Sequence, residues 1–261
     1  MLKTLLSAAG AYRLYEKWLQ YQVKNGNKPE HIAIILDGNR RWASEQMLNS
    51  PWIGHQFGAS KVESLLDWCL DLKVRSITLY AFSTENFQRS SQEVERIMEI
   101  ATGKLQEILT DERIRKNEIR VKVIGRVGLL PKSVQELISK VETATRDNKQ
   151  HFLNIAFAYG GRAEIVDATR KIAQKIEKGE LKPDAITEEV FAEHLYTAYL
   201  PKQDPDLIIR TSGEERLSGF LLWQSAYSEL FFLDVYWPDF RRIDLLRAVR
   251  TYQKRRRRFG Q

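Results

Sequence analysis

The sequence contains a single cysteine, Cys69, among its 261 residues, so no disulfide can form within the chain. This usage is typical of a reducing compartment, and we expect a cytoplasmic protein with Cys69 in its core. No apolar run is long enough to span a bilayer. Residues 1–24 also lack the continuous apolar segment and the small-residue cleavage site of a signal peptide. Any contact with a membrane is therefore expected to be peripheral.

Linkers, repeats and low-complexity segments are also absent, because no Pro-, Gly- or Ser-rich stretch divides the chain. With 43% hydrophobic residues, the chain is long enough to bury one large core. We predict one domain over residues 29–261, preceded by an N-terminal amphipathic helix within residues 1–28. The net charge of +7 favours an anionic partner, which can be a nucleic acid, a lipid surface or a phosphorylated substrate.

Residues 2–24 predict an amphipathic helix, because apolar and aromatic side chains recur there at helical spacing. The segment carries four basic residues and one acidic residue, and the residues NGNKP at 25–29 end it. Two interpretations stay open at this point. The helix lies on a membrane surface, or it packs on the domain or on a partner chain.

Six short runs rich in apolar and β-branched residues predict strands, at 32–36, 75–82, 119–125, 152–159, 206–210 and 229–236. Helical patterns lie between or after them, at about 54–73, 90–116, 131–147, 161–178, 187–197 and 240–258. Strands that alternate with helices are typical of βαβ units. We therefore predict an α/β fold, with a central, largely parallel six-stranded sheet flanked by helices.

Polar and basic residues follow the predicted strands directly, at 37–41, 83–89, 125–126, 160–162 and 210–218. The carboxyl ends of parallel strands share one edge of a sheet, so these residues should converge on one cleft. After the first strand, Asp37 can hold Mg²⁺, Gly38 lets backbone N–H groups approach a phosphate, and Arg40 and Arg41 can bind its oxygens. A solvated turn is the alternative for this stretch alone, and the convergence favours a polyanion site.

Other candidates each have a structural alternative. His55 begins a predicted helix, where it can donate to a phosphate or simply cap the helix. Three arginines can clamp phosphates or lie free on the surface: Arg89, Arg210 and Arg216. Ser218 can donate to a ligand or cap the next helix. Glu229 lies in an aromatic run and needs either a metal ion or an ion-pair partner.

Several blocks of the sequence match motifs of a known family. They are HIAIILDGNRRW at 31–42, Gly54-His55, TLYAFSTENF at 78–87 with Arg89, LNIA at 153–156 with YGGR at 159–162, DLIIRTSGE at 206–214, and FLLWQ at 220–224 through Glu229 to WPDF at 237–240. With these blocks in this order, the sequence resembles the cis-prenyltransferases, which include undecaprenyl diphosphate synthase. The resemblance runs from about residue 31 to residue 260.

The resemblance implies a magnesium-dependent enzyme that condenses isopentenyl diphosphate repeatedly onto an allylic diphosphate, farnesyl or geranylgeranyl. The product would be a long-chain cis-polyprenyl diphosphate, the precursor of a lipid carrier. The family motifs make Asp37 and Glu229 the two Mg²⁺ carboxylates, and they make Asn86 a participant in proton removal. They assign the allylic diphosphate to Gly38, Asn39, Arg40, Arg41, Trp42 and His55. They place Ser83, Thr84 and Glu85 between the two substrates, and Phe87 and Arg89 in the same substrate-binding loop. They assign the binding of isopentenyl diphosphate to Arg210, Arg216 and Ser218.

The resemblance further implies an apolar tunnel between the sheet and the helices at about 54–73 and 90–116. Each added isoprenoid unit would bury about five carbons there, so the depth of the tunnel can act as a ruler. It also implies a homodimer or a heterodimer, of which we expect a homodimer, and a C-terminal Arg-x-Gly element that can complete the neighbour's site. Arg258 and Gly260 fit that element.

The sequence departs from the bacterial pattern in three places. An arginine that often precedes Gly54 is missing from the local sequence NSPWI at 49–53, which puts one phosphate contact in doubt. Phe87 replaces a common tryptophan. The N-terminal helix is closer to archaeal and eukaryotic members. The Asp-Asp-x-x-Asp motif of the all-helical trans synthases is absent.

Two other functions are compatible with parts of the sequence. A non-catalytic partner subunit tends to lose the aspartate and the arginine clamp, whereas this chain keeps Asp37, Asn86, Arg89, Arg210 and Arg216. A nucleic-acid binder is suggested only by the basic run at 254–258, and no nucleic-acid-binding motif supports it. We therefore expect no nucleic-acid partner.

Overall fold

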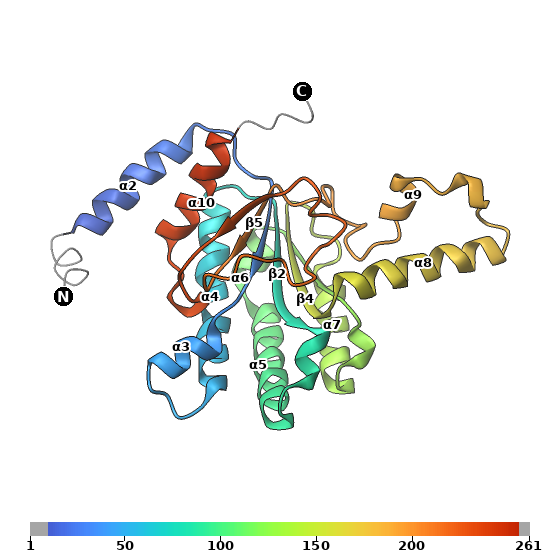
Figure 1. Ribbon diagram of the computed structural model, residues 1–261, viewed down its shortest axis with the longest axis horizontal. Coiled ribbons are helices and arrows are strands. Elements are labelled where there is room, and N and C mark those ends of the chain that lie inside the picture. Colours follow the sequence, from blue (N-terminus) through green and yellow to red (C-terminus); the bar gives the residue numbers. More distant parts are fainter. Residues whose placement is uncertain (1–9, 256–261) are drawn as a thin grey trace.

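A six-stranded sheet forms the centre of the computed structural model, which describes residues 10–255 (Figure 1). Its strands are β1 (His31–Ile35), β2 (Ser76–Ser83), β3 (Ile119–Ile124), β4 (His151–Tyr159), β5 (Leu207–Arg210) and β6 (Glu229–Phe232). Their order is β3-β4-β2-β1-β5-β6, and every pairing between them is parallel. The predicted α/β fold is confirmed, and the carboxyl ends of all six strands point to one edge.

The helices are α2 (Ala11–Lys24), α3 (Asn39–Glu45), α4 (Pro51–Asp71), α5 (Ser91–Thr110), α6 (Glu112–Lys116), α7 (Lys132–Thr145), α8 (Gly161–Glu177), α9 (Glu188–Ala192) and α10 (Arg242–Lys254). Within residues 10–255, four short 3₁₀ turns accompany them: η1 (Thr84–Gln88), η2 (Val127–Leu129), η3 (Pro183–Ala185) and η4 (Trp237–Asp239). Helices therefore connect most of the strands, as parallel pairing requires.

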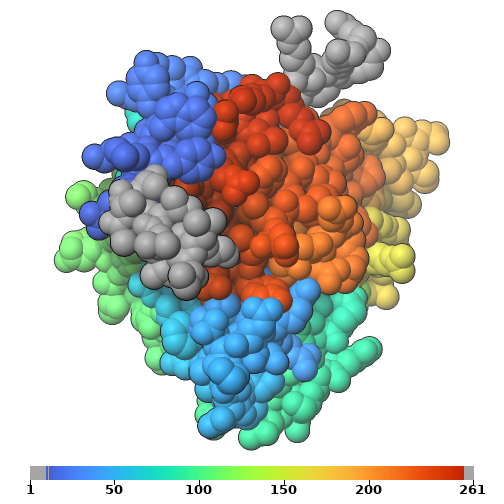
Figure 2. Space-filling model, turned by 60° about the vertical axis from the view of Figure 1, so that its left-hand side comes forward, coloured from blue at the N-terminus to red at the C-terminus, as the bar shows by residue number. Residues whose placement is uncertain are grey.

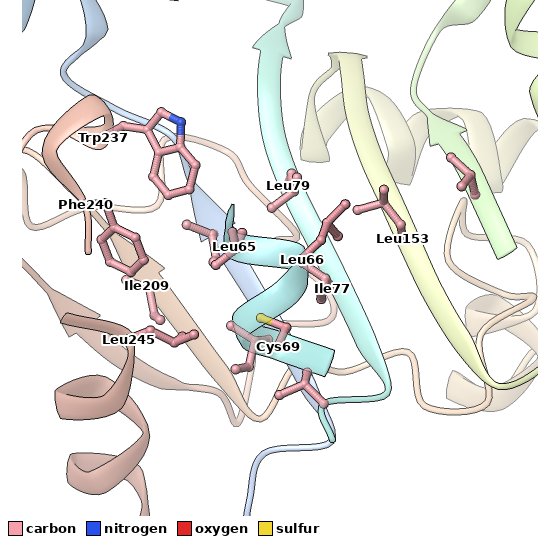
Figure 3. Packing of buried hydrophobic residues seen from close by; sticks show 14 of the residues in the cluster. Leu65, Leu66, Cys69, Ile77, Leu79, Leu153, Ile209, Trp237, Phe240 and Leu245 are labelled. Carbon is pink, nitrogen blue, oxygen red and sulfur yellow. The ribbon is translucent and has the colours of Figure 1, made fainter. Parts of the chain in front are cut away.

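Side chains that alternate along each strand divide the core between the two faces of the sheet. Ile32 and Ile34 of β1 join the larger cluster, which α4, α5, α7 and α10 cover. Figure 3 shows Leu65 and Cys69 of α4 in this cluster. Cys69 is fully buried, so the predicted core position is confirmed, and this burial raises the pKa of its thiol to about 12. Ala33 and the other strand residues whose side chains point to the opposite face of the sheet belong to a smaller cluster there.

Several element bounds differ from the prediction for local reasons. The predicted helix at 90–116 is broken at Asp111, whose side chain accepts a hydrogen bond from the backbone N–H of Arg113 and starts α6. The predicted helix at 187–197 is helical only over α9. Beyond α9, the backbone N–H of Tyr196 donates to the carboxylate of Glu164 instead. The predicted strand at 229–236 ends at Phe232, and α3 was not predicted.

Helix α2 lies along α10 on the surface of the molecule (Figures 1 and 2). Leu19 and Val23 are fully buried in this contact, so packing on the domain is confirmed for the described part of the helix. Leu14 and Tyr21 lie on the other side and are 69% and 75% exposed. Residues 2–9 of the predicted helix lie outside the described residues. Across residues 10–255, no helix has the length and apolar character to cross a bilayer.

Candidate active site

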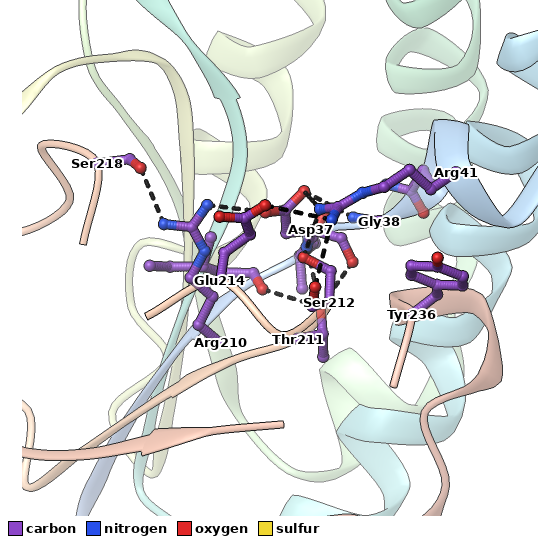
Figure 4. A network of polar contacts seen from close by, with 12 residues as sticks. Asp37, Gly38, Arg41, Arg210, Thr211, Ser212, Glu214, Ser218 and Tyr236 are labelled. Atoms are coloured by element: carbon purple, nitrogen blue, oxygen red, sulfur yellow. Dashed lines mark hydrogen bonds and ion pairs between the residues drawn. The ribbon is translucent and has the colours of Figure 1, made fainter. Parts of the chain in front are cut away.

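Asp37 lies two residues beyond β1, beside the end of β5, because Ile35 pairs with Arg210 in the sheet. Its Oδ2 accepts a hydrogen bond from Arg210 Nη2 at 2.8 Å (Figure 4). The Thr211 hydroxyl accepts from the Asp37 backbone N–H at 3.0 Å and donates to the Asp37 carbonyl at 2.7 Å. These contacts hold the turn after β1 firmly against β5.

Gly38 turns the chain from β1 into α3 with a φ of 99°, a conformation that favours glycine. A Cβ at this position would lie 2.6 Å from Cδ1 of Tyr236, so a side chain would also collide there. The Gly38 N–H donates to Oδ1 of Asp37 at 2.7 Å. The turn therefore depends on glycine, and it starts a helix whose first residues include Arg40 and Arg41.

Arg41 extends from α3 toward the loop after β5. Its Nη2 donates to Oγ of Ser212 at 2.6 Å and lies 3.4 Å from Oδ1 of Asp37. Its Nη1 lies 3.3 Å from Oε1 of Glu214, and its guanidinium is 5.7 Å from the centre of the Tyr236 ring. Arg41 thus joins the ends of two neighbouring strands (Figure 4).

The carboxyl group of Asp37 is ionised at neutral pH. Partial burial raises its pKa, but hydrogen bonds from Arg210 and Ser212 and the charge of Arg41 outweigh this effect, so the pKa lies below its usual value. The side chain remains 29% exposed, so its oxygen lone pairs are accessible to a ligand.

Arg210 also reaches the loop that follows β5. Its Nη1 donates to Oγ of Ser218 at 2.8 Å and to the carbonyl of Arg216. Arg210 is 5% exposed, and its Nε has no partner among residues 10–255. The side chain of Arg216 is 63% exposed and points Nη1 at Oε2 of Glu214, 2.5 Å away. The three predicted residues Arg210, Arg216 and Ser218 therefore lie together.

A second group of predicted residues meets at a carboxylate that the sequence did not single out. Oε1 of Glu93 lies 3.1 Å from His55 Nε2, 3.1 Å from Arg89 Nη1 and 3.7 Å from Arg40 Nε. Glu93 is 6% exposed. Burial lowers the pKa of His55, and the charges of Arg89 and Arg40 lower it further. Glu93 acts in the opposite direction, but the lowering effects outweigh it, so the imidazole is neutral at pH 7.

Turn η1 begins at Thr84 and contains the predicted residues Glu85, Asn86 and Phe87. The backbone N–H of Ser83 donates to Oδ1 of Asn86 at 3.0 Å. This bond uses one lone pair of the amide oxygen and points it at the backbone, and the amide nitrogen can donate to a ligand. The ring of Phe87 packs edge-on against Phe82 at 4.9 Å and belongs to the wall of the core.

Glu229 is the predicted metal ligand that the structure separates from Asp37. It starts β6 opposite Leu207, which starts β5, whereas Asp37 lies beyond the carboxyl end of β1. Its Oε2 lies 3.3 Å from Nε of Arg255. Within one chain the two carboxylates therefore lie at opposite ends of the parallel strands. The acidic residue that Arg41 brings toward Asp37 is Glu214. The described part of the chain holds no cluster of three or more metal-ligating side chains.

A cavity of about 360 Å³ lies between the sheet and helices α4, α5 and α7, where the tunnel was predicted. Asn39 and His55 line it where it meets the charged groups. Most of the other lining is apolar and includes Leu36, Val62, Leu66, Leu79, Ala81, Ile97, Ala101, Leu105, Ile155 and Phe157. The cationic site at the strand ends is therefore continuous with an apolar cavity.

Residues 35–260 match the family described as "Putative undecaprenyl diphosphate synthase". The chain belongs to this family. The tritrans,polycis-undecaprenyl-diphosphate synthase (geranylgeranyl-diphosphate specific) of Methanocaldococcus jannaschii is 53% identical over 98% of this chain and 91% of its own length. The enzyme of the same name from Pyrococcus horikoshii is 53% identical over 96% of this chain and 94% of its own length.

Solved structures of this family share the fold. Lavandulyl diphosphate synthase from Lavandula x intermedia, in complex with dimethylallyl diphosphate, superposes with a TM-score of 0.86 at 39% identity, covering 90% of this chain and 99% of that chain. A probable undecaprenyl diphosphate synthase from Campylobacter jejuni gives 0.72 at 32% identity, covering 90% and 100%. The family's prenyl diphosphate synthases are transferases, and this chain is an enzyme of that class.

Some members of the site carry no strong signal in the sequence. Glu93 follows a capping serine in the first turn of α5, where an acidic residue is usual on any exposed helix. Thr211 and Ser212 lie in a matched block but have side chains typical of any turn. Trp42, predicted to line the site, packs against Phe57 at 4.9 Å. Arg258 and Gly260 lie outside the described residues.

Proposed function

We propose that the protein condenses isopentenyl diphosphate onto an allylic diphosphate and repeats the step to make a long-chain cis-polyprenyl diphosphate. One observation carries this proposal: a cationic site at the strand ends opens into an apolar cavity, and Asn39 and His55 line the junction. An allylic diphosphate matches both parts, because its charged head fits the cationic site and its apolar tail fits the cavity. A nucleotide or a free polyphosphate would leave the cavity unused.

The head of the allylic diphosphate is assigned to the turn after β1. The backbone N–H groups after Gly38 start α3 and face an anion favourably. Arg41 supplies one guanidinium, while Arg40 and Arg89 supply two more from the Glu93 group. His55 is neutral there and can donate one hydrogen bond without adding charge.

The diphosphate of isopentenyl diphosphate is assigned to Arg210, Arg216 and Ser218. Arg210 keeps one N–H group, at Nε, that has no partner among residues 10–255, and Arg216 is exposed next to it, so both have donors to offer to an anion. Ser218 adds a hydroxyl that already accepts from Arg210. Arginine suits this role because its planar donors match two phosphate oxygens at once.

Asp37 is the residue that would hold a magnesium ion, together with diphosphate oxygens. An ionised, partly exposed carboxylate fits this ion, which typically takes one or two protein carboxylates plus substrate phosphates. When bound, the ion would neutralise the charge that develops on the leaving diphosphate. Arg41 and Arg89 would share that task from the protein side, since both are held in place before substrate arrives.

In the condensation, the bond between C1 and oxygen of the allylic diphosphate breaks while C4 of isopentenyl diphosphate bonds to C1. The double bond moves to C2–C3, and one proton leaves C2. Asn86 is a poor base, and its amide oxygen already accepts from Ser83. We therefore assign the proton to a diphosphate oxygen, which the Asn86 amide N–H can hold in position.

The starter is proposed to be geranylgeranyl diphosphate, with farnesyl diphosphate as the alternative. The relatives that are 53% identical carry geranylgeranyl specificity in their names. The proposed product is the precursor of a lipid carrier. A single coupling to a short allylic diphosphate, the kind of ligand in the lavandulyl diphosphate synthase structure, would give only one product size.

The test is to incubate the protein with labelled isopentenyl diphosphate, Mg²⁺ and each starter in turn, and then to size the products. A ladder of products with cis double bonds, strongest with geranylgeranyl diphosphate, is the expected result. A failure to elongate any starter would overturn the proposal and favour a partner subunit without activity. A single coupled product would instead assign the protein to one-step coupling.

We also propose that the exposed side of α2 contacts an anionic membrane, which would receive the apolar product. Leu14 and Tyr21 project away from α10, and Lys17 keeps the helix basic. Replacing Leu14 and Tyr21 with glutamate should lower binding to phosphatidylglycerol vesicles and leave turnover in detergent unchanged. Unchanged vesicle binding would overturn the assignment.

A further inference from the structure

The cavity is too small for the proposed products. An engineered apolar cavity of about 150 Å³ holds one benzene ring, so by the same ratio 360 Å³ holds about fourteen carbons. That is fewer than a geranylgeranyl chain carries. If the proposed function is right, even the first elongated product must extend past the walls of the cavity.

One part of the cavity wall is charged rather than apolar. Glu63 of α4, Lys104 and Glu107 of α5, and Arg113 of α6 all line the cavity away from Asn39 and His55. Lys104 is 30% exposed and Glu63 is 45% exposed. These side chains therefore separate the cavity from solvent, along the seam between α4 on one side and α5 with α6 on the other.

Ion pairs close this seam. Lys104 Nζ lies 2.6 Å from Oε1 of Glu63 and 2.7 Å from Oε2 of Glu107, so Lys104 ties α5 to α4. Partial burial lowers the pKa of Lys104, but the two carboxylates outweigh it and the amine stays charged. Arg113 adds contacts from α6, at 3.7 Å to Glu63 and 3.2 Å to Asp67.

Such a seam can open at little cost. Exposed ion pairs contribute little to stability because water solvates their charges well when they separate. Most of the rest of the wall consists of apolar side chains, whose separation would expose apolar surface. An apolar chain that outgrows the cavity therefore meets least resistance between Lys104 and Glu63.

We propose that the Lys104–Glu63 pair is a gate through which the growing prenyl chain leaves the cavity, and that it helps to set the length of the product. This inference rests on the proposed function. The gate slows elongation at the length where the chain end reaches the seam. Beyond that length, the chain lies between the helices with the pair opened.

A reversible crosslink tests the gate directly. In a Glu63→Cys/Lys104→Cys variant, a short bis-methanethiosulfonate linker would hold α4 and α5 together, and dithiothreitol would release them. The native Cys69 is fully buried and is not expected to react. The crosslinked enzyme should elongate the starter little or not at all, because the closed cavity holds fewer carbons than the starter already carries, and reduction should restore elongation.

The matched control is an Arg96→Cys/Glu99→Cys variant treated in the same way. Arg96 and Glu99 form a 2.6 Å ion pair on α5 and do not line this cavity. Their crosslink should leave the product lengths unchanged. Equal elongation before and after crosslinking at Glu63 and Lys104, or an equal loss of elongation in the control, would overturn the gate.

A variant that lacks the ion pair should change the product length in the opposite direction. Lys104→Met removes the charge and keeps the length of the side chain, so intermediates at the seam should accumulate less and the longest product should grow. Lys104→Arg keeps the pair and should match the wild type, as should Arg96→Met. Identical product ladders for Lys104→Met and wild type would contradict the gate. A wild type that elongates no starter would overturn the proposed function and the gate with it, so the two failures are distinguishable.

Discussion

Arg210 Nη2 donates to Asp37 Oδ2 over 2.8 Å, although 173 positions separate the two residues in the chain. The bond joins the end of β5 to the turn after β1 and keeps a buried guanidinium next to an ionised carboxylate. Each residue is assigned to a different substrate. The pair therefore sets the spacing between the two proposed diphosphate positions before either substrate binds.

Asp37→Ala should lower turnover by about a hundredfold or more, because an ion and a diphosphate would lose their shared protein ligand. Chelation of divalent metal should stop the wild-type reaction in the same assay. The measurement is product formation from labelled isopentenyl diphosphate, with circular dichroism to confirm that the variant is folded. Near-normal product formation by a folded Asp37→Ala protein would contradict the assignment.

Glu93→Gln should lower kcat about tenfold or more, because Arg89 and His55 lose the carboxylate that orients them. The KM for the allylic diphosphate should not rise, since removing a negative charge favours an anion. Steady-state kinetics measure both constants. Glu95→Gln, on the exposed side of the same helix, is the control. A raised KM with unchanged kcat would show that Glu93 does not position the catalytic groups.

Gly38→Ala should abolish most activity and lower the free energy of unfolding by more than about 1 kcal/mol, because φ is 99° and the added Cβ meets Tyr236. Gly103→Ala is the matched control. Gly103 lies within α5 and has open space around its Cα, so alanine should stabilise the protein by about 0.5–1 kcal/mol. Urea denaturation measures both changes. Equal stabilities for the two variants would refute the steric argument.

His31 should make stability depend on pH. Burial lowers its folded-state pKa to about 4, below the ordinary 6.5, so the unfolded state takes up a proton more readily. The contribution of His31 is present above pH 6.5 and is lost as pH falls toward 4, by about 3 kcal/mol in all. The free energy of unfolding of wild type and His31→Gln, measured across this range, should converge at low pH. A constant difference would contradict the shift.

The C-terminal Arg258 and Gly260 are proposed to complete the site of the partner in a homodimer. Asp37→Ala and Arg258→Ala proteins, each nearly inactive, should regain activity when they are unfolded and refolded together. About half the dimers are then mixed with one intact site each, so about a quarter of wild-type activity should return. No recovery would place Arg258 in the site of its own chain, and an active Arg258→Ala protein would exclude a role for it.

Much of the fold was predictable because its signals are local. The β-branched run before Asp37 predicted a strand, and the switch to helical spacing after each strand predicted parallel pairing. The polar residues after β1, β2 and β5 then followed at one end of the strands, where they form two groups around Asp37 and Glu93, whereas Arg126 after β3 pairs with Asp167. The resemblance added roles to these residues, but their convergence was already implied by the parallel sheet.

The order of the strands and the burial of single side chains were decided by tertiary packing. Nothing local places β5 beside β1, and this placement brings Arg210 to Asp37 while it leaves Glu229 at the opposite end of the strands. Glu93 resembles any acid in a first helical turn, and only the packing of α5 on α4 buries it among cations. Strand order and burial depend on contacts between distant segments of the chain, and local residue patterns do not predict those contacts.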